Sequence, residues 1–148
     1  MRKVHISELK SLVGQDVGVS DWFTLDQDRI NRFADVTEDH QWIHVDVERA
    51  EKEIGGTIAH GFLTLSMMSA MTYQILDIQG VSRGINYGFD KIRFTGMVRA
   101  GQRVRLREKV LEVEDKAGGF AIKRECTVEV EGSDRPALVA EWIGVVYP

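Results

Sequence analysis

The chain has 148 residues, enough for one domain with its own hydrophobic core, and we expect a single domain over residues 1–148. Its 43% hydrophobic and 28% charged residues are typical of a globular protein, and a net charge of −4 argues against nucleic acid as its partner. The single cysteine, Cys126, excludes an intramolecular disulfide and a cysteine-cluster metal site.

The N-terminal residues and one uncharged stretch bear on where the protein is located. The first ten residues contain no apolar run long enough for a signal peptide. Residues 57–76 contain no Asp, Glu, Lys or Arg, but histidine, serine, threonine and glutamine interrupt the stretch, and a lone membrane span would leave them in lipid. We therefore expect a buried helix, no membrane partner and a cytoplasmic location.

Helical patterns dominate the first half of the chain. Residues 7–14 predict a helix with Ser7 as its N-cap. After a strand expected around residues 16–25, residues 24–37 predict a helix with a capping box formed by Thr24 and Gln27.

Two more helices are predicted before the strands begin. Residues 46–55 predict a short helix with Val47 among its inward residues and Gly55 at its end. Residues 60–76 are apolar nearly all round, which predicts a long helix surrounded by protein.

Strand patterns dominate the second half. Residues 119–131 alternate between apolar and polar, and only Arg124 breaks the inward row. Residues 101–114 change phase at Val110–Leu111 and residues 84–94 near Asp90–Lys91, and each change predicts a bulge or bend. Residues 114–119 predict a hairpin turn, and residues 137–147 a final strand.

These elements predict an α+β fold in which a curved antiparallel sheet of at least five strands wraps around one long helix. The apolar helix needs cover on several sides, and a strongly bent sheet supplies it. Such a sheet has edges that dimerisation can cover or continue, so we expect a homodimer.

Residues 37–44, with the sequence TEDHQWIH, concentrate acids and histidines directly after a predicted helix. Asp39 and His44 are five residues apart, an offset that would point them away from each other on a straight helix, so the segment must be irregular if they cooperate. A carboxylate beside an imidazole can hold a water molecule and take its proton. The alternative is that Asp39 caps a turn and His44 is a surface histidine.

The same segment also has the spacing of a metal motif. His40 and His44 form H-x-x-x-H, with Glu38, Asp39 and His60 as further candidate ligands. The usual motif carries a glutamate directly after the first histidine, where this chain has glutamine. Metal binding therefore ranks below the other two interpretations, and no metal is expected.

A second candidate segment, IAHGFLTLS at residues 58–66, leads into the long helix. The N–H of Gly61 at the helix start has no intrahelical partner, and the helix dipole adds partial positive charge there. This combination suits an oxygen that becomes negative, such as a carbonyl turning into an enolate. The alternative is that Gly61 only permits a tight turn.

Together the two segments resemble the MaoC-like (R)-specific enoyl-CoA hydratases. In that family an aromatic residue precedes a Ser/Thr-Gly-Asp-x-Asn-Pro-aliphatic-His run, and a small residue follows six positions later. Residues 58–67 resemble a second block, with Gly61 and Ser66 at matching positions, and residues 94–105 resemble a third. The first-block positions in register are Phe33, Thr37, Asp39, Ile43, His44 and Ala50.

The resemblance implies a hot-dog fold, usually dimeric, and the reversible syn addition of water to a trans-2-enoyl thioester, giving an (R)-3-hydroxyacyl thioester. Asp39 and His44 would hold and deprotonate the water that attacks C3, and would deliver a proton to C2. The Gly61 N–H would bind the thioester oxygen, with Ser66 supporting the pair. No cofactor is expected, because coenzyme A or an acyl carrier protein carries the substrate.

The chain departs from the family pattern inside the first block. Glu38 replaces the glycine before Asp39, and Gln41–Trp42 replaces Asn-Pro, which removes a proline constraint from the loop. These changes resemble a subgroup related to nodulation protein N and bear on substrate choice more than on the reaction. Gln41 and Trp42 are therefore candidate substrate-binding residues.

A cluster of arginines offers further candidates. Arg93 and Arg99 can meet the phosphates of coenzyme A or of a carrier-protein arm. Arg103, Arg105 and Arg107 share the outward face of one predicted strand, where charges commonly keep a sheet soluble.

Two other functions stay open, because one fold hosts several chemistries. A hot-dog thioesterase typically uses an acid on the central helix, and residues 61–76 contain none. A non-catalytic acyl-thioester binding protein would not need Asp39 and His44, although Glu38 and Trp42 keep this alternative open.

Overall fold

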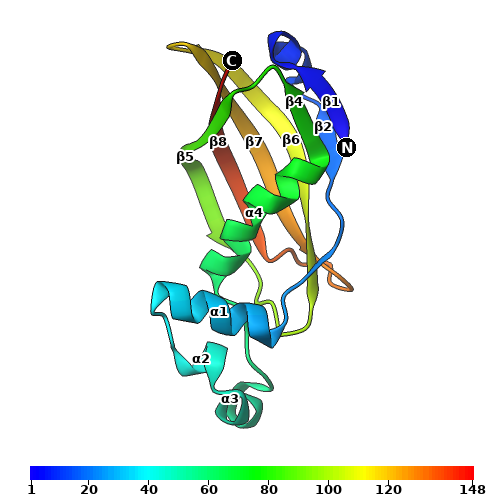
Figure 1. Cartoon of the computed structure of the whole chain (residues 1–148). Helices are drawn as coiled ribbons and strands as arrows, with labels where there is room; N and C mark the ends of the chain where they lie inside the picture. The colour runs from blue at the N-terminus through cyan, green and yellow to red at the C-terminus, as the bar shows by residue number, and fades with distance from the viewer.

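A curved antiparallel sheet packs against one long helix in the protein, as seen in a computed structural model that describes residues 1–148 (Figure 1). The predicted α+β hot-dog fold is confirmed. The helices are α1 (Gln27–Thr37), α2 (Trp42–Val45), α3 (Val47–Ile54) and α4 (Gly61–Ile75), with a 3₁₀ helix, η1 (Ile6–Leu12). The strands are β1 (Arg2–His5), β2 (Asp16–Val19), β3 (Phe23–Thr24), β4 (Leu76–Gln79), β5 (Arg83–Phe94), β6 (Arg103–Lys116), β7 (Gly119–Val130) and β8 (Leu138–Tyr147).

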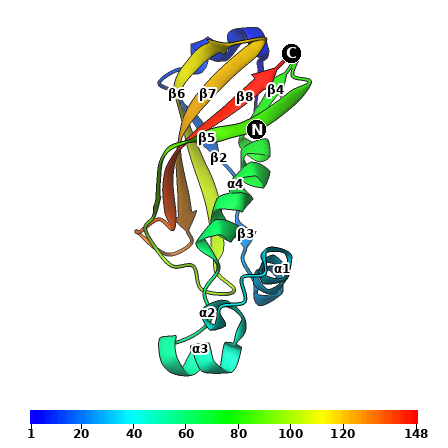
Figure 2. The ribbon, with the colours of Figure 1, turned by 90° about the vertical axis from the view of Figure 1, so that its left-hand side faces the viewer.

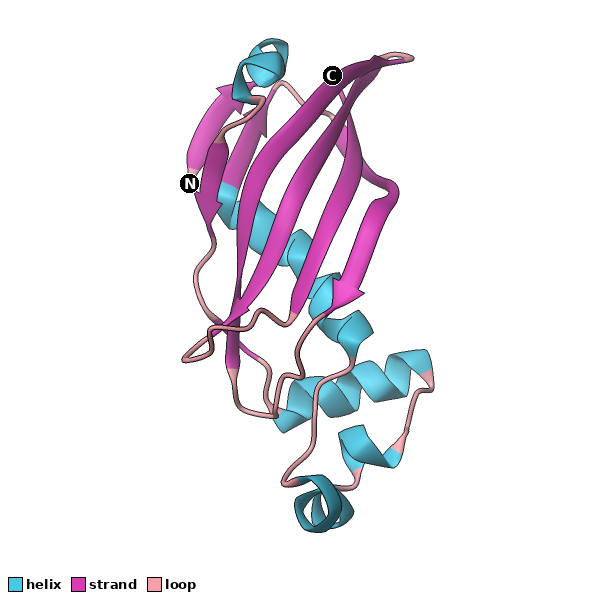
Figure 3. Ribbon diagram, turned by 180° about the vertical axis from the view of Figure 1, so that it is seen from behind, coloured by secondary structure: helices cyan, strands magenta, loops and turns pink.

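The main sheet has the order β2-β6-β7-β8-β5, with β3 also pairing with β6. Figure 2 shows α4 lying along one face of the sheet, with α1, α2 and α3 gathered at its N-terminal end. Figure 3 shows the opposite face of the sheet, which no helix covers. The sheet therefore has one face toward α4 and one face free.

The predicted phase changes are register shifts in the sheet. The pairing of β6 with β7 shifts between Val110 and Glu112, and that of β5 with β8 shifts between Phe89 and Lys91. Each extra residue bends its strand, which lets the sheet curve around α4. The hairpin between β6 and β7 turns at residues 117–118, also as predicted.

The core lies between α4 and the inner face of the sheet. Met68, Met71 and Ile75 of α4 are at most 2% exposed and belong to one hydrophobic cluster with residues of β6, β7 and β8. The prediction that α4 is surrounded by protein is wrong for the single chain, because Phe62 and Tyr73 on its other face are 65% and 75% exposed. A uniformly apolar helix does not indicate which of its faces the sheet covers.

Several details at the N-terminus differ from the sequence predictions. The first helix is 3₁₀ rather than α, and its cap is His5, whose Nδ1 accepts from the Ser7 N–H. The N-cap of α1 is Asp26 rather than Thr24, and its carboxylate accepts from the Arg29 N–H. The patterns located the helices, but side-chain geometry selected the capping residue among several polar neighbours.

Two short strands were not predicted. β1 and β4 form a separate parallel pair, and β4 begins directly where α4 ends. In α3, Gly55 ends the helix at φ 74° as predicted, whereas Val47 is exposed rather than inward. No helix of the protein is both long enough and apolar enough to cross a membrane.

Candidate active site

The segment that joins α1 to α2 is irregular, as cooperation between Asp39 and His44 requires. Helix α1 ends at Thr37, and Glu38 then adopts the left-handed conformation, with φ 62° and ψ 16°. Asp39 and His40 lie outside any helix, and α2 begins again at Trp42. The reversal at Glu38 turns the chain back on itself, so that Asp39 faces a residue of the following helix.

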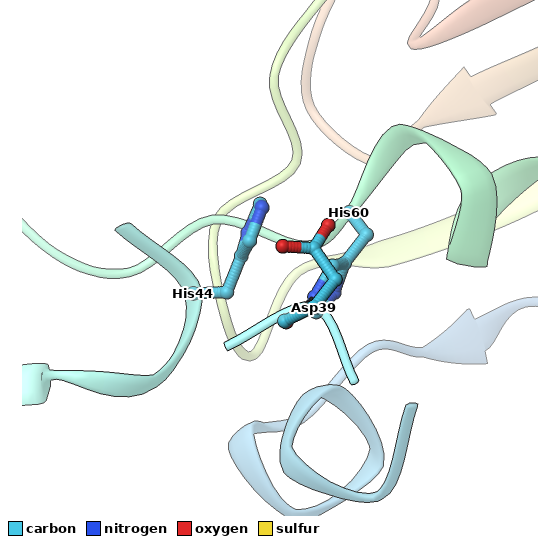
Figure 4. Close-up of side chains that lie close together, drawn as sticks. All are labelled: Asp39, His44 and His60. Carbon is cyan, nitrogen blue, oxygen red and sulfur yellow. Dashed lines mark hydrogen bonds between the residues drawn. The ribbon is translucent and has the colours of Figure 1, made fainter. Parts of the chain in front are cut away.

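Asp39, His44 and His60 lie together near the start of α4 (Figure 4). One carboxylate oxygen of Asp39 and one ring nitrogen of each histidine lie within 4.8 Å of one another. Asp39 and His44 form no direct hydrogen bond. A gap of this size between two polar atoms suits a bridging water molecule.

His44 is buried, and its surroundings select one tautomer. Its Nδ1 lies 2.6 Å from the carbonyl oxygen of Ile58, which can only accept, so Nδ1 carries the proton in the neutral ring. The lone pair therefore remains on Nε2. Burial lowers the pKa of His44, assisted by the charge of His60, against the hydrogen bond to Ile58 and the charge of Asp39. His44 is thus held as a neutral base.

His60 is a site residue that the sequence suggested only as a metal ligand. Its ring is 3% exposed and stacks on that of His44, with centroids 3.7 Å apart and planes inclined by 22°. Its Nε2–H donates to the Asp39 carbonyl oxygen at 3.0 Å, and its Nδ1 is buried without a partner. His60 therefore links both members of the pair. The sequence feature that could have indicated His60 as a site residue is its position directly before Gly61.

The stacked rings decide between a water site and a metal site. A histidine nitrogen binds a metal along its lone pair, which lies in the plane of the ring. The planes of the two rings are nearly parallel, so the in-plane lone pairs of His44 and His60 are poorly placed to meet at one ion. His40, the other half of the predicted H-x-x-x-H motif, lies elsewhere, with Nε2 2.9 Å from Asp35 Oδ1. The arrangement favours water.

Gly61 begins α4 beside this cluster, and its N–H donates to no group of the chain. The fifteen-residue helix directs partial positive charge to this end. A Cβ at this position would lie 2.9 Å from Cδ1 of Phe94, so a residue with a side chain requires that ring to move. The predicted free donor is present, and the Phe94 ring lies against it.

His44 and Gly61 line one pocket of about 550 Å³, a volume typical of small-molecule sites. Thr64 also lines it and is buried, whereas Ser66 is exposed and its hydroxyl donates to the Phe62 carbonyl oxygen at 2.7 Å. The single chain thus presents Thr64, and not Ser66, to the pocket. Thr64 and Ser66 are two positions apart, which places them about 200° apart around the helix, so they cannot share a face.

None of the four predicted substrate-binding residues is in the wall of this pocket. Gln41 is exposed and occupies the N-cap position of α2 without a capping hydrogen bond from its side chain, and the ring of Trp42 packs under the Arg49 guanidinium at 4.1 Å. Arg93 is exposed and bonds to the Ile92 carbonyl, and Arg99 bonds to that of Gly56. The pocket itself is lined by residues that the sequence did not single out, among them Gln102, Ser133 and Arg135.

Four other side chains clarify the sequence pattern. Gln27, predicted in a capping box, instead donates to the His44 carbonyl oxygen at 2.7 Å and ties α1 to α2. Arg103, Arg105 and Arg107 pair with Glu129 and Glu131 on the outward face of the sheet. Their predicted position on the outward face of the strand is confirmed.

Comparison with known proteins identifies the family. The model of the MaoC-like domain matches residues 8–132. The chain belongs to the MaoC-like dehydratase family. One relative is named a 3-hydroxyacyl-thioester dehydratase, and the predicted enzyme class, a hydro-lyase, is confirmed.

The sequences of individual relatives align with this MaoC-like protein over most of its length. It is 45% identical to nodulation protein N of Rhizobium leguminosarum bv. viciae over 99% of this chain and 93% of that one. It is 47% identical to 3-hydroxyacyl-thioester dehydratase Z of Mycobacterium tuberculosis over 93% of each chain. The structure of R-hydratase PhaJ1 from Pseudomonas aeruginosa shares the fold, with TM-score 0.75, 24% identity, and coverage of 91% of this chain and 81% of that one.

Proposed function

We propose that the protein catalyses the reversible syn hydration of trans-2-enoyl thioesters to (R)-3-hydroxyacyl thioesters. The observation that carries this proposal is the His44 ring, whose Nδ1–H is bonded to Ile58 so that its Nε2 lone pair is left for the gap beside Asp39. The names of the relatives, a 3-hydroxyacyl-thioester dehydratase and an R-hydratase, support the substrate class and the stereochemistry.

In the hydration direction, Asp39 and His44 hold one water molecule between them. The neutral Nε2 of His44 accepts its proton as the oxygen attacks C3, and a proton is then delivered to C2 from the same pair. Because both groups stand on one side of the bound chain, water and proton arrive on the same face, which gives syn addition. His60 acts as a positioning residue, since its ring lies against His44 and its N–H bonds the Asp39 carbonyl.

The negative charge that forms in this step is on the thioester oxygen. Gly61, whose N–H is free, lines the same pocket as His44, and the helix dipole of α4 adds to the effect of this donor. One such donor contributes on the order of 10²–10³ in rate, and a positioned acid–base pair about 10²–10⁴. The reaction needs no further cofactor. Coenzyme A or an acyl carrier protein enters as the carrier of the acyl group, with Arg135 at the pocket as a candidate partner for its phosphates.

The assembly we propose is a homodimer. Strand β5 is at the edge of the sheet, and its exposed side chains include Ile85, Tyr87 and Phe89, at 50%, 62% and 37%. The exposed apolar face of α4 carries Phe62 and Tyr73. A free edge strand beside exposed apolar side chains can bind a second copy of the chain, which would extend the sheet and cover α4.

The experiment follows the loss of enoyl-thioester absorbance with crotonyl-CoA for the wild type and for Asp39→Asn and His44→Gln. Removing either group is expected to lower kcat/KM by at least a hundredfold, with unchanged circular dichroism. The matched control is His40→Gln, since His40 belongs to the same segment but lies away from the pocket; its activity is expected to stay at the wild-type level.

Product chirality and free thiol are measured in the same reactions. An (R)-alcohol without thiol release supports the hydratase. Steady thiol release without absorbance loss would replace it with a thioesterase. Acyl-CoA binding without either product would make the chain a binding protein.

A further inference from the structure

Thr64 carries the one hydroxyl in the wall of the candidate active-site pocket that has no close acceptor. The hydroxyl side chains that line this pocket are those of Thr64, Thr95 and Ser133. The other two donate to backbone carbonyl oxygens, Thr95 at 2.6 Å and Ser133 at 3.0 Å. The Thr64 hydroxyl lies 3.5 Å from its nearest acceptor, the His60 carbonyl oxygen, whereas O–H···O hydrogen bonds are about 2.5–3.0 Å long.

The His60 carbonyl oxygen is already occupied by backbone donors. It accepts the N–H groups of Leu63 at 3.0 Å and of Thr64 at 3.2 Å, which together use both of its lone pairs. Elsewhere in the chain, the hydroxyls of Thr37 and Ser66 donate to the carbonyl four residues earlier at 2.6 and 2.7 Å. Thr64 is only 3% exposed, so bulk water does not satisfy its hydroxyl either. A buried donor is therefore left at the pocket wall.

Thr64 and Gly61 lie on the same side of α4. Residues three positions apart are about 60° apart around a helix and about 4.5 Å apart along it. Helical side chains tilt toward the N-terminus, so the Thr64 hydroxyl reaches back to the first turn, beside the carbonyl of His60 that directly precedes Gly61. The free N–H of Gly61 and the Thr64 hydroxyl are thus two neighbouring donors in the wall of the pocket that His44 also lines.

The surroundings favour strong hydrogen bonds from these donors. Ala59, Val98 and Ala137 also line the pocket and are at most 8% exposed, so much of its wall is apolar. A hydrogen bond to a developing negative charge is stronger in an apolar environment than in water. Thr64 is buried within the single chain, so a second copy at β5 and at the exposed face of α4 leaves its burial unchanged.

We propose that Thr64 is a catalytic residue whose hydroxyl binds the thioester oxygen of the substrate together with the Gly61 N–H. This inference rests on the proposed hydratase function. As the bond from water to C3 forms, the electron pair of the C2–C3 double bond moves toward the thioester carbonyl, and its oxygen becomes negative. Both donors strengthen their hydrogen bonds to this oxygen and keep their protons. The proton that completes the reaction reaches C2 from Asp39 and His44.

The test measures the hydration of crotonyl-CoA by Thr64→Val, which removes the hydroxyl and keeps the shape of the side chain. We expect kcat to fall on the order of 10²-fold, as loss of one oxyanion donor does, with KM little changed because the bond strengthens only as charge develops. Thr64→Ser keeps a hydroxyl and is expected to retain most of the activity. The matched control is Thr127→Val, the same substitution at an outward position of β7, with kcat expected at the wild-type level.

A second pair of variants separates a catalytic hydroxyl from a structural one. Thr64→Ser and Thr64→Ala differ chiefly in the hydroxyl, and they decide the matter if Thr64→Val does not fold. A buried hydroxyl without a good acceptor contributes little to stability, so we expect similar midpoints of urea unfolding but a much lower kcat for Thr64→Ala. Equal kcat values for the pair would overturn the proposal, as would a lower unfolding midpoint for Thr64→Ala than for Thr64→Ser.

A spectroscopic measurement identifies the atom that the hydroxyl binds. The absorbance of cinnamoyl-CoA moves to longer wavelength when hydrogen-bond donors polarise its carbonyl group. Binding is measured in the Asp39→Asn background, so that the thioester is not consumed, and we expect a smaller red shift when Thr64→Val is added. A slow Thr64→Val enzyme with an unchanged red shift would place the hydroxyl on the attacking water and overturn the assignment.

The same measurements distinguish failure of this inference from failure of the proposed function. Hydration by the wild type with an equal kcat for Thr64→Val refutes the role of Thr64 and leaves the hydratase intact. No hydration by the wild type, with a red shift of cinnamoyl-CoA that Thr64→Val diminishes, refutes the hydratase and supports the two donors. Absence of both hydration and red shift refutes both.

Discussion

Glu38 is the only residue other than glycine with a positive φ in the chain, and it stands where the family pattern has glycine. At φ 62° a side chain with a Cβ costs roughly 1–2 kcal/mol. Glycine removes this strain but is freer in the unfolded chain, which offsets about 0.4–1 kcal/mol. Glu38→Gly is therefore expected to raise the free energy of unfolding by about 0.5–1 kcal/mol.

The corresponding thermal shift follows from the chain length. With an unfolding entropy of about 2.1 cal/mol/K per residue, 148 residues give about 310 cal/mol/K, so 1 kcal/mol raises Tm by about 3 °C. The assay is urea denaturation followed by circular dichroism, with thermal melts at one fixed protein concentration, because a dimer would make stability depend on concentration.

Two controls separate backbone strain from charge. Glu38→Ala removes the carboxylate beside Asp39 but keeps a Cβ, so we expect no stabilisation. Gly55 ends α3 at φ 74° with no atom within 4 Å of an added Cβ, so Gly55→Ala should destabilise the protein by about 1 kcal/mol through strain alone. If Glu38→Gly and Glu38→Ala shift stability equally, repulsion between neighbouring carboxylates is responsible and the strain explanation is refuted.

Three further outcomes are expected. Burial lowers the pKa of His44, and protonation takes the lone pair from Nε2, so kcat/KM should fall with decreasing pH through a midpoint below the ordinary value of 6.5; a midpoint above 6.5 in a pH–rate profile would contradict the assignment. Gly61→Ala places its Cβ 2.9 Å from the Phe94 ring and should lower kcat/KM by about tenfold to a hundredfold, because small displacements misalign the site. Adding Phe94→Ala should restore most of this loss in the same steady-state assay, and a double variant as slow as the single one would show that the contact is not the cause. Tyr87→Lys on the free edge of β5 should shift sedimentation from dimer toward monomer, whereas an unchanged sedimentation coefficient would exclude β5 from the interface.

Much of the fold could be predicted because its signals are local. Side chains alternate between the two faces of a strand, so the alternation of residues 119–131 indicates the pairing register, and the change of phase at Val110 indicates a bulge. The spacing also predicted an irregular segment if Asp39 and His44 cooperate, since two residues five positions apart do not share a face of a straight helix. Their roles in the reaction stay predictions until the variants are measured.

Only the tertiary structure decided the contacts between distant segments. The tautomer of His44 depends on the Ile58 carbonyl, fourteen residues away, and the stack with His60 depends on how α4 meets the loop. Which face of α4 turns inward is set by packing, because a helix apolar on all sides has no preferred face, and this placed Thr64 rather than Ser66 at the pocket. Arg124 is visible in the sequence as an interruption of an apolar row, but its burial emerges only when the neighbouring strands and α4 are brought together.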